Sequence, residues 1–510
     1  MRHVTAVQRA VSLIFPDRAN GQRRFSQFTS MADENAPLLG SEPSIQENRR
    51  SKVALLLKSL ALLCAVGAAV AIFFIPRHQH EVFTPDFSDL NGFCDHVEEI
   101  PSMQYLERQQ ELARTLVFDN ASALIAESGA TMKYYTNVDW ALSERPFVMI
   151  LKPDASSNHG VDLTFVVPAF EGLRARENIE KASLPDSLQI SIVEWEESKS
   201  PYEKIASVLP KEGNIELDIG TRLFIADGIS KFVSGRSSIA STNVQMLRMI
   251  KSHEEIEIMR CANQATVAAI KEVKKHVRAG ILEQDIAAMT HKALESAGLT
   301  ETWVLALIDE RAALPHGEAG DHKLGSEGVV LVDAGGRLKG KGILCHCEIK
   351  QSRLSIRITD LLCFDIVKSG YESDITRTFF ISEEPKQFNE TITRAWYTVK
   401  EAQSAVLDKA TVDLPCAEVD TIARTIIGKA KYGDYFKHRL GHGIGLEGHE
   451  QPYMVQSNTA QSLKPGMTFS VEPGIYVPHQ FGIRLEDIVV MTKDGPELLS
   501  GGLANSPWDL

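Results

Sequence analysis

Five residues in the C-terminal third of the chain have the types and spacing of metal ligands. They are Asp333, Asp374, His442, Glu472 and Glu486. Asp333 follows the apolar run 329–332, and an unpaired carboxylate at the end of a buried strand is costly unless it has a partner. Any one of these residues alone is more often a solvated or ion-paired surface group. Taken together, four carboxylates and one imidazole suit two hard divalent cations, because the ligand charge of −4 balances theirs.

The motifs around these residues resemble those of the pita-bread metallopeptidases, and within that superfamily most closely Xaa-Pro aminopeptidase and prolidase. They occur in the family's order and read VDAG, GYESDITRTF, HRLGHGIGLEGHEQPY, VEPGIY and GIRLED. Residues 101–245 resemble the family's creatinase/prolidase-type N-terminal domain through YYTNVDWALSERP at 134–146. The fold class implied is α+β, with this smaller α/β domain preceding a pita-bread catalytic domain at 246–510.

The resemblance also implies what each candidate ligand does. Asp374 and Glu486 bridge two divalent cations, usually Mn²⁺, although the ligand set also tolerates Zn²⁺ or Co²⁺. Asp333 completes one coordination sphere, and His442 with Glu472 completes the other. The cations activate a shared water for attack on the scissile carbonyl, and Glu472 relays the proton of that water.

Further catalytic and substrate-binding residues follow from the same resemblance. The catalytic set is Glu472, His449 and His438, and the substrate-binding set is His316, Arg484 and Tyr476. His449 is expected to contact substrate and stabilise the tetrahedral intermediate. For His316 and His438 the alternative is a loop histidine without a role.

The activity implied is that of an exopeptidase that cleaves between an N-terminal residue and a following proline, so its partners are peptides with proline at the second position. The run GIRLED and the preceding α/β domain favour this branch over a methionine aminopeptidase-like enzyme. A non-catalytic relative that binds partners is the third reading. The motifs leave open whether dipeptides or longer peptides are cleaved, and a homodimer is compatible with them.

One departure from the family pattern concerns the spacing of the first two ligands. Asp333 and Asp374 are 41 residues apart, whereas the resemblance places them on one short β-hairpin. Removing residues 341–370 leaves VDAGGRLKG followed by YESDITRTF, which restores the pattern. Thirty residues correspond to ninety nucleotides, and residues 340–342 (GKG) can be encoded with an internal splice donor. We therefore interpret 341–370 as a translated, retained intron.

Periodicity predicts the elements that position these residues. Helices are expected at 106–128, from a capping box at 252–255 to Gly280, and at 283–297. Strands are expected at 132–136, 147–151, 163–167, 188–193, 215–218, 223–225, 329–333, 467–471 and 482–490. Alternation of strands and helices over 101–245 favours an α/β domain.

Composition excludes several classes of protein. The 510 residues are 44% hydrophobic and 24% charged, as in a folded protein of two or three domains. Residues 1–52 carry eight Lys/Arg and five Asp/Glu, which is a charge of +3. Because the whole chain has a net charge of −13, residues 53–510 carry −16. So acidic a body argues against nucleic-acid binding. Seven cysteines are too few for a disulfide scaffold.

An apolar segment near the N-terminus predicts a membrane anchor. Residues 53–75 read VALLLKSLALLCAVGAAVAIFFI, and Lys58 is the only charge among them. A helix of this length spans a bilayer core. More basic residues precede the segment than follow it, which predicts a single-pass type II protein with a disordered cytosolic tail at 1–52. A stalk at 76–100 and a lumenal or extracellular catalytic domain would follow. Residues 34–39 (ENAPLL) match an acidic dileucine signal that sorts membrane proteins to vacuoles or lysosomes. A chance match in a polar tail explains them equally well.

Overall fold

The computed structural model describes residues 85–338 and 370–510. The predicted tail, the predicted membrane segment and residues 341–369 of the predicted insert lie outside these ranges. Among the described residues, no helix is long and apolar enough to cross a membrane.

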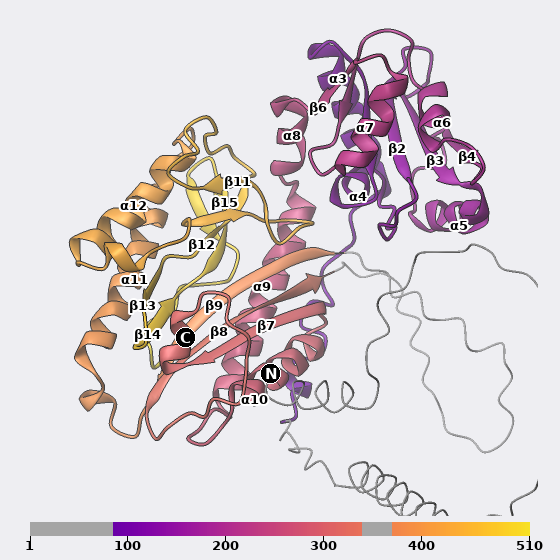
Figure 1. Cartoon of the computed structure of the whole chain (residues 1–510). Helices are drawn as coiled ribbons and strands as arrows, with labels where there is room; N and C mark the ends of the chain where they lie inside the picture. The colour runs from indigo at the N-terminus through magenta and orange to yellow at the C-terminus, as the bar shows by residue number, and fades with distance from the viewer. Residues whose placement is uncertain (1–84, 339–369) are drawn as a thin grey trace, which may run out of the picture. The chain divides into compact units, whose positions relative to one another are not determined.

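The N-terminal part of the described chain contains an α/β domain with one six-stranded sheet (Figure 1), as its sequence predicts. The strand order is β4-β3-β2-β1-β5-β6, in which β2 is antiparallel to both its neighbours and the other pairs are parallel. The strands are β1 (Ala121–Glu127), β2 (Val148–Pro153), β3 (Val161–Pro168), β4 (Ile190–Trp195), β5 (Asn214–Leu217) and β6 (Ser237–Ile239). The helices are α3 (Ser102–Phe118), α4 (Ala130–Thr136), α5 (Gly172–Lys181), α6 (Pro201–Ser207), α7 (Leu223–Phe232) and α8 (Thr242–Met249).

Three predictions from periodicity are wrong in this domain. The stretch 106–128 is helical only in its first half and then continues as β1. The runs 132–136 and 223–225, which were expected to be strands, belong to helices α4 and α7. Short apolar runs do not distinguish a strand from a buried helical turn. In α7 the buried Ile225 and Ile229 are four residues apart, which is helical spacing.

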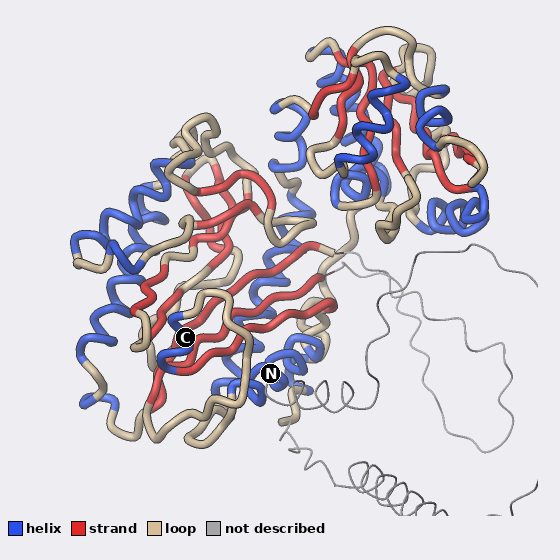
Figure 2. Tube along the Cα trace, in the orientation of Figure 1, coloured by secondary structure: helices blue, strands red, loops and turns tan. Residues whose placement is uncertain are grey.

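The C-terminal part combines three sheets with four long helices (Figure 2). The first sheet is β7-β8-β9, from β7 (Thr300–Ile308), β8 (Gly328–Leu338) and β9 (Tyr371–Ile381). The second is β11-β10-β12-β15-β16, from β10 (Gly441–Gly443), β11 (Glu450–Met454), β12 (Thr468–Val471), β15 (Asp487–Thr492) and β16 (Gly495–Leu498). The third pairs β13 (Gly474–Val477) with β14 (Phe481–Arg484). The helices are α9 (His253–Lys274), α10 (Glu283–Ser296), α11 (Glu390–Lys409) and α12 (Cys416–Lys429).

The predicted start of helix α9 is confirmed. The Ser252 side chain accepts a hydrogen bond from the Glu255 backbone N–H, and the Glu255 carboxylate accepts one from the Ser252 N–H. These two bonds satisfy backbone donors that the first helical turn would otherwise leave free. The helix ends at Lys274, before Gly280, and it packs with α10 on the β7-β8-β9 sheet.

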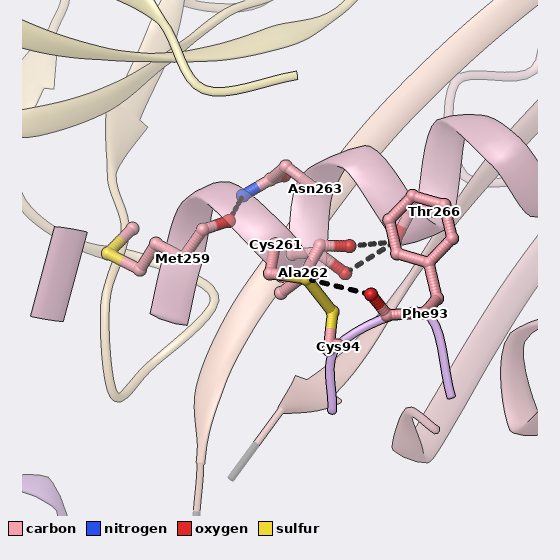
Figure 3. The surroundings of a disulfide bond; sticks show 8 residues. Phe93, Cys94, Met259, Cys261, Ala262, Asn263 and Thr266 are labelled. Carbon is pink, nitrogen blue, oxygen red and sulfur yellow. Dashed lines mark hydrogen bonds between the residues drawn. A yellow bond between two sulfur atoms is a disulfide. The ribbon is translucent and has the colours of Figure 1, made fainter. Parts of the chain in front are cut away.

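A disulfide joins the segment before α3 to α9. Cys94 and Cys261 are bonded (Figure 3), and Phe87, Leu90 and Val97 of the same segment are buried. The described part of the predicted stalk therefore packs as part of the core. No spacing pattern predicts this pairing, because the two cysteines are 167 residues apart.

The β8-β9 hairpin has a regular register up to the boundary of the described residues. Gly335 pairs with Asp374, and Leu338 pairs with Tyr371. A Cβ on Gly335 would lie 2.0 Å from the Ser373 carbonyl oxygen, so only glycine permits this close strand approach. With Leu338 opposite Tyr371, removal of residues 341–370 would leave two residues between the strands, which is the commonest hairpin connection.

We expect deletion of residues 341–370 to leave the hairpin register unchanged and to stabilise the protein. Shortening the connection to two residues lowers the closure entropy, which is worth about 2 kcal/mol in the free energy of unfolding. Chemical denaturation of the full chain and of the deletion variant measures this difference.

The retained-intron interpretation is tested on the native protein. Mass spectrometry should find no tryptic peptide from inside 341–370, and the transcript should lack the ninety nucleotides. Abundant peptides from this stretch in fully active protein would show that it is a genuine part of the enzyme.

Candidate metal centre

Three strands and two strand connections bring the five predicted ligands together. Asp333 lies on β8, Asp374 on β9 and His442 on β10, while Glu472 follows β12 and Glu486 lies between β14 and β15. The ligand atoms of Asp333, Asp374 and Glu486 lie within 4.8 Å of one another, and so do those of His442, Glu472 and Glu486. A third such group contains Asp374, His442 and His449. Asp374, Glu486 and His442 each occur in two of these groups, so the groups overlap.

The donor atoms fit divalent cations. Asp333 Oδ1 is buried and has no hydrogen-bond partner among the described residues. His442 Nδ1 lies 3.1 Å from the Gly443 carbonyl oxygen and donates to it, so its Nε2 lone pair faces outward. That nitrogen lies 3.3 Å from Glu472 Oε1 and 3.7 Å from Asp374 Oδ2. When the imidazole is neutral and the carboxylates are ionised, no proton lies between His442 Nε2 and either carboxylate oxygen. A cation bound to the nitrogen and to these oxygens would stabilise the arrangement.

Burial shifts the pKa values of the ligands strongly. It raises the pKa of Glu472 to about 7, an effect that the nearby Arg484 guanidinium partly opposes. Burial, together with the charges of neighbouring carboxylates, raises the pKa values of Asp374 and Glu486 well above their ordinary range. Burial lowers the pKa of His442 to about 3, so this imidazole is neutral and available as a ligand at neutral pH.

Three polar residues that the sequence did not single out orient the ligands. Thr376 Oγ1 donates to Glu486 Oε2 at 2.6 Å, and Ser470 Oγ donates to Glu472 Oε1 at 3.2 Å. Asn263 Oδ1 accepts from the Asp374 backbone N–H at 3.2 Å, and it belongs to the turn of α9 next to the disulfide (Figure 3). The threonine and the serine each lie two residues from a ligand, so strand alternation was an available signal for them. No such signal exists for Asn263, which is 111 residues from Asp374.

A hydrogen-bonded chain lies beside the ligands. Arg484 Nη1 donates to the Tyr476 hydroxyl at 3.0 Å, and that hydroxyl lies 2.9 Å from His438 Nε2. His438 Nδ1 donates to the Arg439 carbonyl oxygen at 2.7 Å, so Nε2 accepts the Tyr476 proton. Burial and the Arg484 charge lower the pKa of His438 to about 3. Arg484 also pairs with Asp333.

One cavity of about 410 Å³ collects nearly all of the predicted site residues. It is lined by the five ligands together with His316, His438, His449 and Arg484. Tyr476 is not among the lining residues, but its hydroxyl is hydrogen-bonded to His438 and Arg484, which are. The lining residues that the sequence did not single out are Trp303, Pro315, Glu372, Arg439 and Gly448.

Comparisons with known proteins agree with this geometry. The sequence profile of metallopeptidase family M24 matches residues 257–347 and 340–493, two ranges that overlap at 340–347. An uncharacterized peptidase of Schizosaccharomyces pombe is 35% identical over 427 residues, which cover 81% of this chain and 85% of that protein.

Solved structures share the fold. The crystal structure of dipeptidase PepE from Mycobacterium ulcerans superimposes with a TM-score of 0.67 at 25% identity, covering 79% of this chain and 97% of that one. The prolidase from Pyrococcus horikoshii gives 0.62 at 23% identity, covering 78% and 99%. Family profile, relatives and ligand geometry agree, and the chain belongs to metallopeptidase family M24, with the pita-bread fold and the divalent-metal chemistry that this family implies.

Proposed function

We propose that this protein is an exopeptidase that hydrolyses the bond between an N-terminal residue and a following proline. The observation that carries the proposal is one cavity in which two overlapping ligand groups lie beside His438 and His449, two histidines whose pKa values are lowered by burial. Relatives named dipeptidase and prolidase support the same reaction class.

Two divalent cations held by the five ligands would lower the pKa of a water and polarise the scissile carbonyl. Glu472 lines the cavity beside His442 Nε2, where its carboxylate can accept the proton of the attacking water. The water oxygen forms the new bond to the carbonyl carbon, the C–N bond breaks, and Glu472 returns the proton to the leaving proline nitrogen. His449, whose ring centroid lies 4.1 Å from that of His442, donates to the carbonyl oxygen as charge develops there.

The cavity suits a prolyl ring because aromatic surfaces lie beside the ligands. Trp303, His316 and His438 line it, and the rings of His438 and Tyr476 are tilted at 56° to each other with centroids 5.4 Å apart. A prolyl residue presents CH₂ groups and no amide N–H, so it needs apolar contact and no acceptor at this position.

Mn²⁺ is the metal we propose, because four of the five ligands are carboxylates and Mn²⁺ favours oxygen ligands more than Zn²⁺ does. Homodimer formation stays a prediction.

Metal reconstitution with defined peptides tests the proposed activity. The metal-free protein, reloaded with Mn²⁺, Zn²⁺ or Co²⁺, is assayed on Xaa-Pro dipeptides, Xaa-Pro-Yaa peptides and Met-Ala peptides. We expect two metal ions per chain and hydrolysis of Xaa-Pro bonds at least tenfold faster than of Met-Ala bonds. Preferential Met-Ala cleavage would indicate the methionine aminopeptidase alternative. Two bound metal ions without hydrolysis would indicate a binding protein.

We also propose a type II membrane protein, anchored by residues 53–75, with its catalytic domain in the lumen or outside the cell. The disulfide between Cys94 and Cys261 supports an oxidising compartment. The sequons at Asn120 and Asn389 are exposed and therefore available for glycosylation. Delivery to a vacuolar or lysosomal membrane would use residues 34–39.

The topology has a direct test in sealed vesicles. External protease should remove the tail at 1–52 and leave the catalytic domain intact, and a glycosidase should increase the mobility of the protein on a gel. Asn120→Gln and Asn389→Gln should each remove one glycan. Digestion of the catalytic domain from the cytosolic side would reverse the proposed orientation.

A further inference from the structure

Arg439 lines the cavity, and no carboxylate of the described residues forms an ion pair with it. It lines the cavity directly after His438 in the sequence. Its Nε is buried without a hydrogen-bond partner, and its guanidinium has no ion-pair partner among the described residues. A buried donor left unpaired costs about 1–3 kcal/mol, so an unsatisfied guanidinium facing a cavity indicates an anionic ligand.

The other arginine of the cavity, Arg484, shows the contrast. Its Nε donates to Thr376 Oγ1 at 2.8 Å, its Nη1 donates to Tyr476, and its Nη2 pairs with Asp333. All three nitrogens are therefore engaged within the protein. Arg439 is the cavity-lining arginine whose donors remain available to a substrate.

Packing holds the Arg439 side chain near the reacting groups. Its guanidinium carbon lies 5.0 Å from the centroid of the Tyr453 ring, an arrangement that favours a fixed guanidinium plane. Arg439 lines the same cavity as Glu472 and His449, the residues proposed to move the proton and to contact the substrate.

We propose that Arg439 binds the free carboxylate of the leaving residue and thereby makes the enzyme a dipeptidase. This inference rests on the proposed exopeptidase function. In a dipeptide the α-carboxylate lies one residue beyond the scissile bond, where a planar guanidinium binds it through two parallel hydrogen bonds. A longer peptide presents a neutral amide at that point and leaves the guanidinium, with its buried Nε, unpaired, so it is disfavoured.

A comparison of acid and amide substrates tests Arg439. For the wild-type enzyme we expect kcat/KM on an Xaa-Pro dipeptide to exceed that on the corresponding Xaa-Pro amide by on the order of 10- to 100-fold. In Arg439→Ala the value for the dipeptide should fall by that factor while the value for the amide changes little, so the ratio approaches one. Arg439→Lys should retain part of the preference. Lys437→Ala, which removes an exposed positive charge two residues away, is the matched control and should keep the wild-type ratio.

Two results would overturn the proposal. One is a wild-type enzyme that cleaves acid and amide equally well. The other is an Arg439→Ala variant that loses activity on both substrates by the same factor, which would make Arg439 an electrostatic support of the metal centre only. The proline preference can fail without affecting this test. If Xaa-Pro substrates are not cleaved, the ratio of kcat/KM for acid and amide is measured instead with a non-proline dipeptide that the enzyme cleaves.

Discussion

Glu472→Gln should lower kcat/KM by on the order of 10³-fold or more while leaving the fold intact. The substitution removes one ligand charge and the proposed proton acceptor together, and the amide cannot return a proton to the leaving nitrogen. The amide oxygen can still accept the hydrogen bond from Ser470, so local packing should change little. Steady-state kinetics, metal content and circular dichroism of the purified variant measure the three effects.

The control for this variant is Glu497→Gln, which neutralises an exposed carboxylate paired with Arg260 far from the cavity lining. It should retain wild-type activity and metal content. Near-normal turnover in Glu472→Gln protein loaded with two metal ions would refute the role assigned to Glu472.

The metal-free protein should lose stability as the pH rises above 6.5. Asp374, Glu472 and Glu486 have pKa values raised by burial, so they hold protons in the folded state that the unfolded chain has already released. Their contribution to stability is complete below the unfolded value near 4 and is lost as the pH rises through the folded pKa, about 7 for Glu472. Each carboxyl that is still protonated in the folded state lowers the free energy of unfolding by up to about 1.4 kcal/mol per pH unit over this window.

The titration of the histidines determines the pH range in which the loss of stability caused by the carboxyls is clearest. The pKa values of His438 and His442 are lowered to about 3, so they favour the folded state above the unfolded value of 6.5 and lose that contribution as the pH falls. Between pH 4.5 and 6.5 the histidines and carboxyls therefore oppose each other. As the pH rises above 6.5 the histidines of the unfolded chain lose their remaining protons, so their opposing effect fades and the effect of the carboxyls dominates.

Denaturation of metal-free and Mn²⁺-loaded protein between pH 6.5 and 8.5 measures this difference. Metal should remove the loss, because cations stabilise the ionised ligands. Asp374→Asn is the informative variant: without metal it should be more stable than wild type above pH 7, and it should gain less from Mn²⁺. A metal-free wild-type protein whose stability stays flat or rises over this range would contradict the repulsion inferred among the ligands.

Local patterns in the sequence predicted the features that depend on neighbours along the chain. The capping box at Ser252 and Glu255 is confirmed, because both partners lie within one helical turn. The predicted strands at 147–151, 163–167, 188–193 and 215–218 correspond to β2, β3, β4 and β5 within a few residues. The short runs at 132–136 and 223–225 were assigned wrongly, since tertiary burial decides their conformation.

The sequence alone supplied the types and order of the five predicted ligands, because motifs carry residue identity and spacing. The family resemblance of those motifs supplied the expectation that Asp333 and Asp374 lie on adjacent strands. Contacts between distant segments were decided only by the tertiary structure. The disulfide of Cys94 with Cys261 and the support of Asp374 by Asn263 each join residues more than a hundred positions apart. Arg439 shows the same limit, because only packing reveals that this charged side chain lines a cavity with its Nε buried and without a hydrogen-bond partner among the described residues.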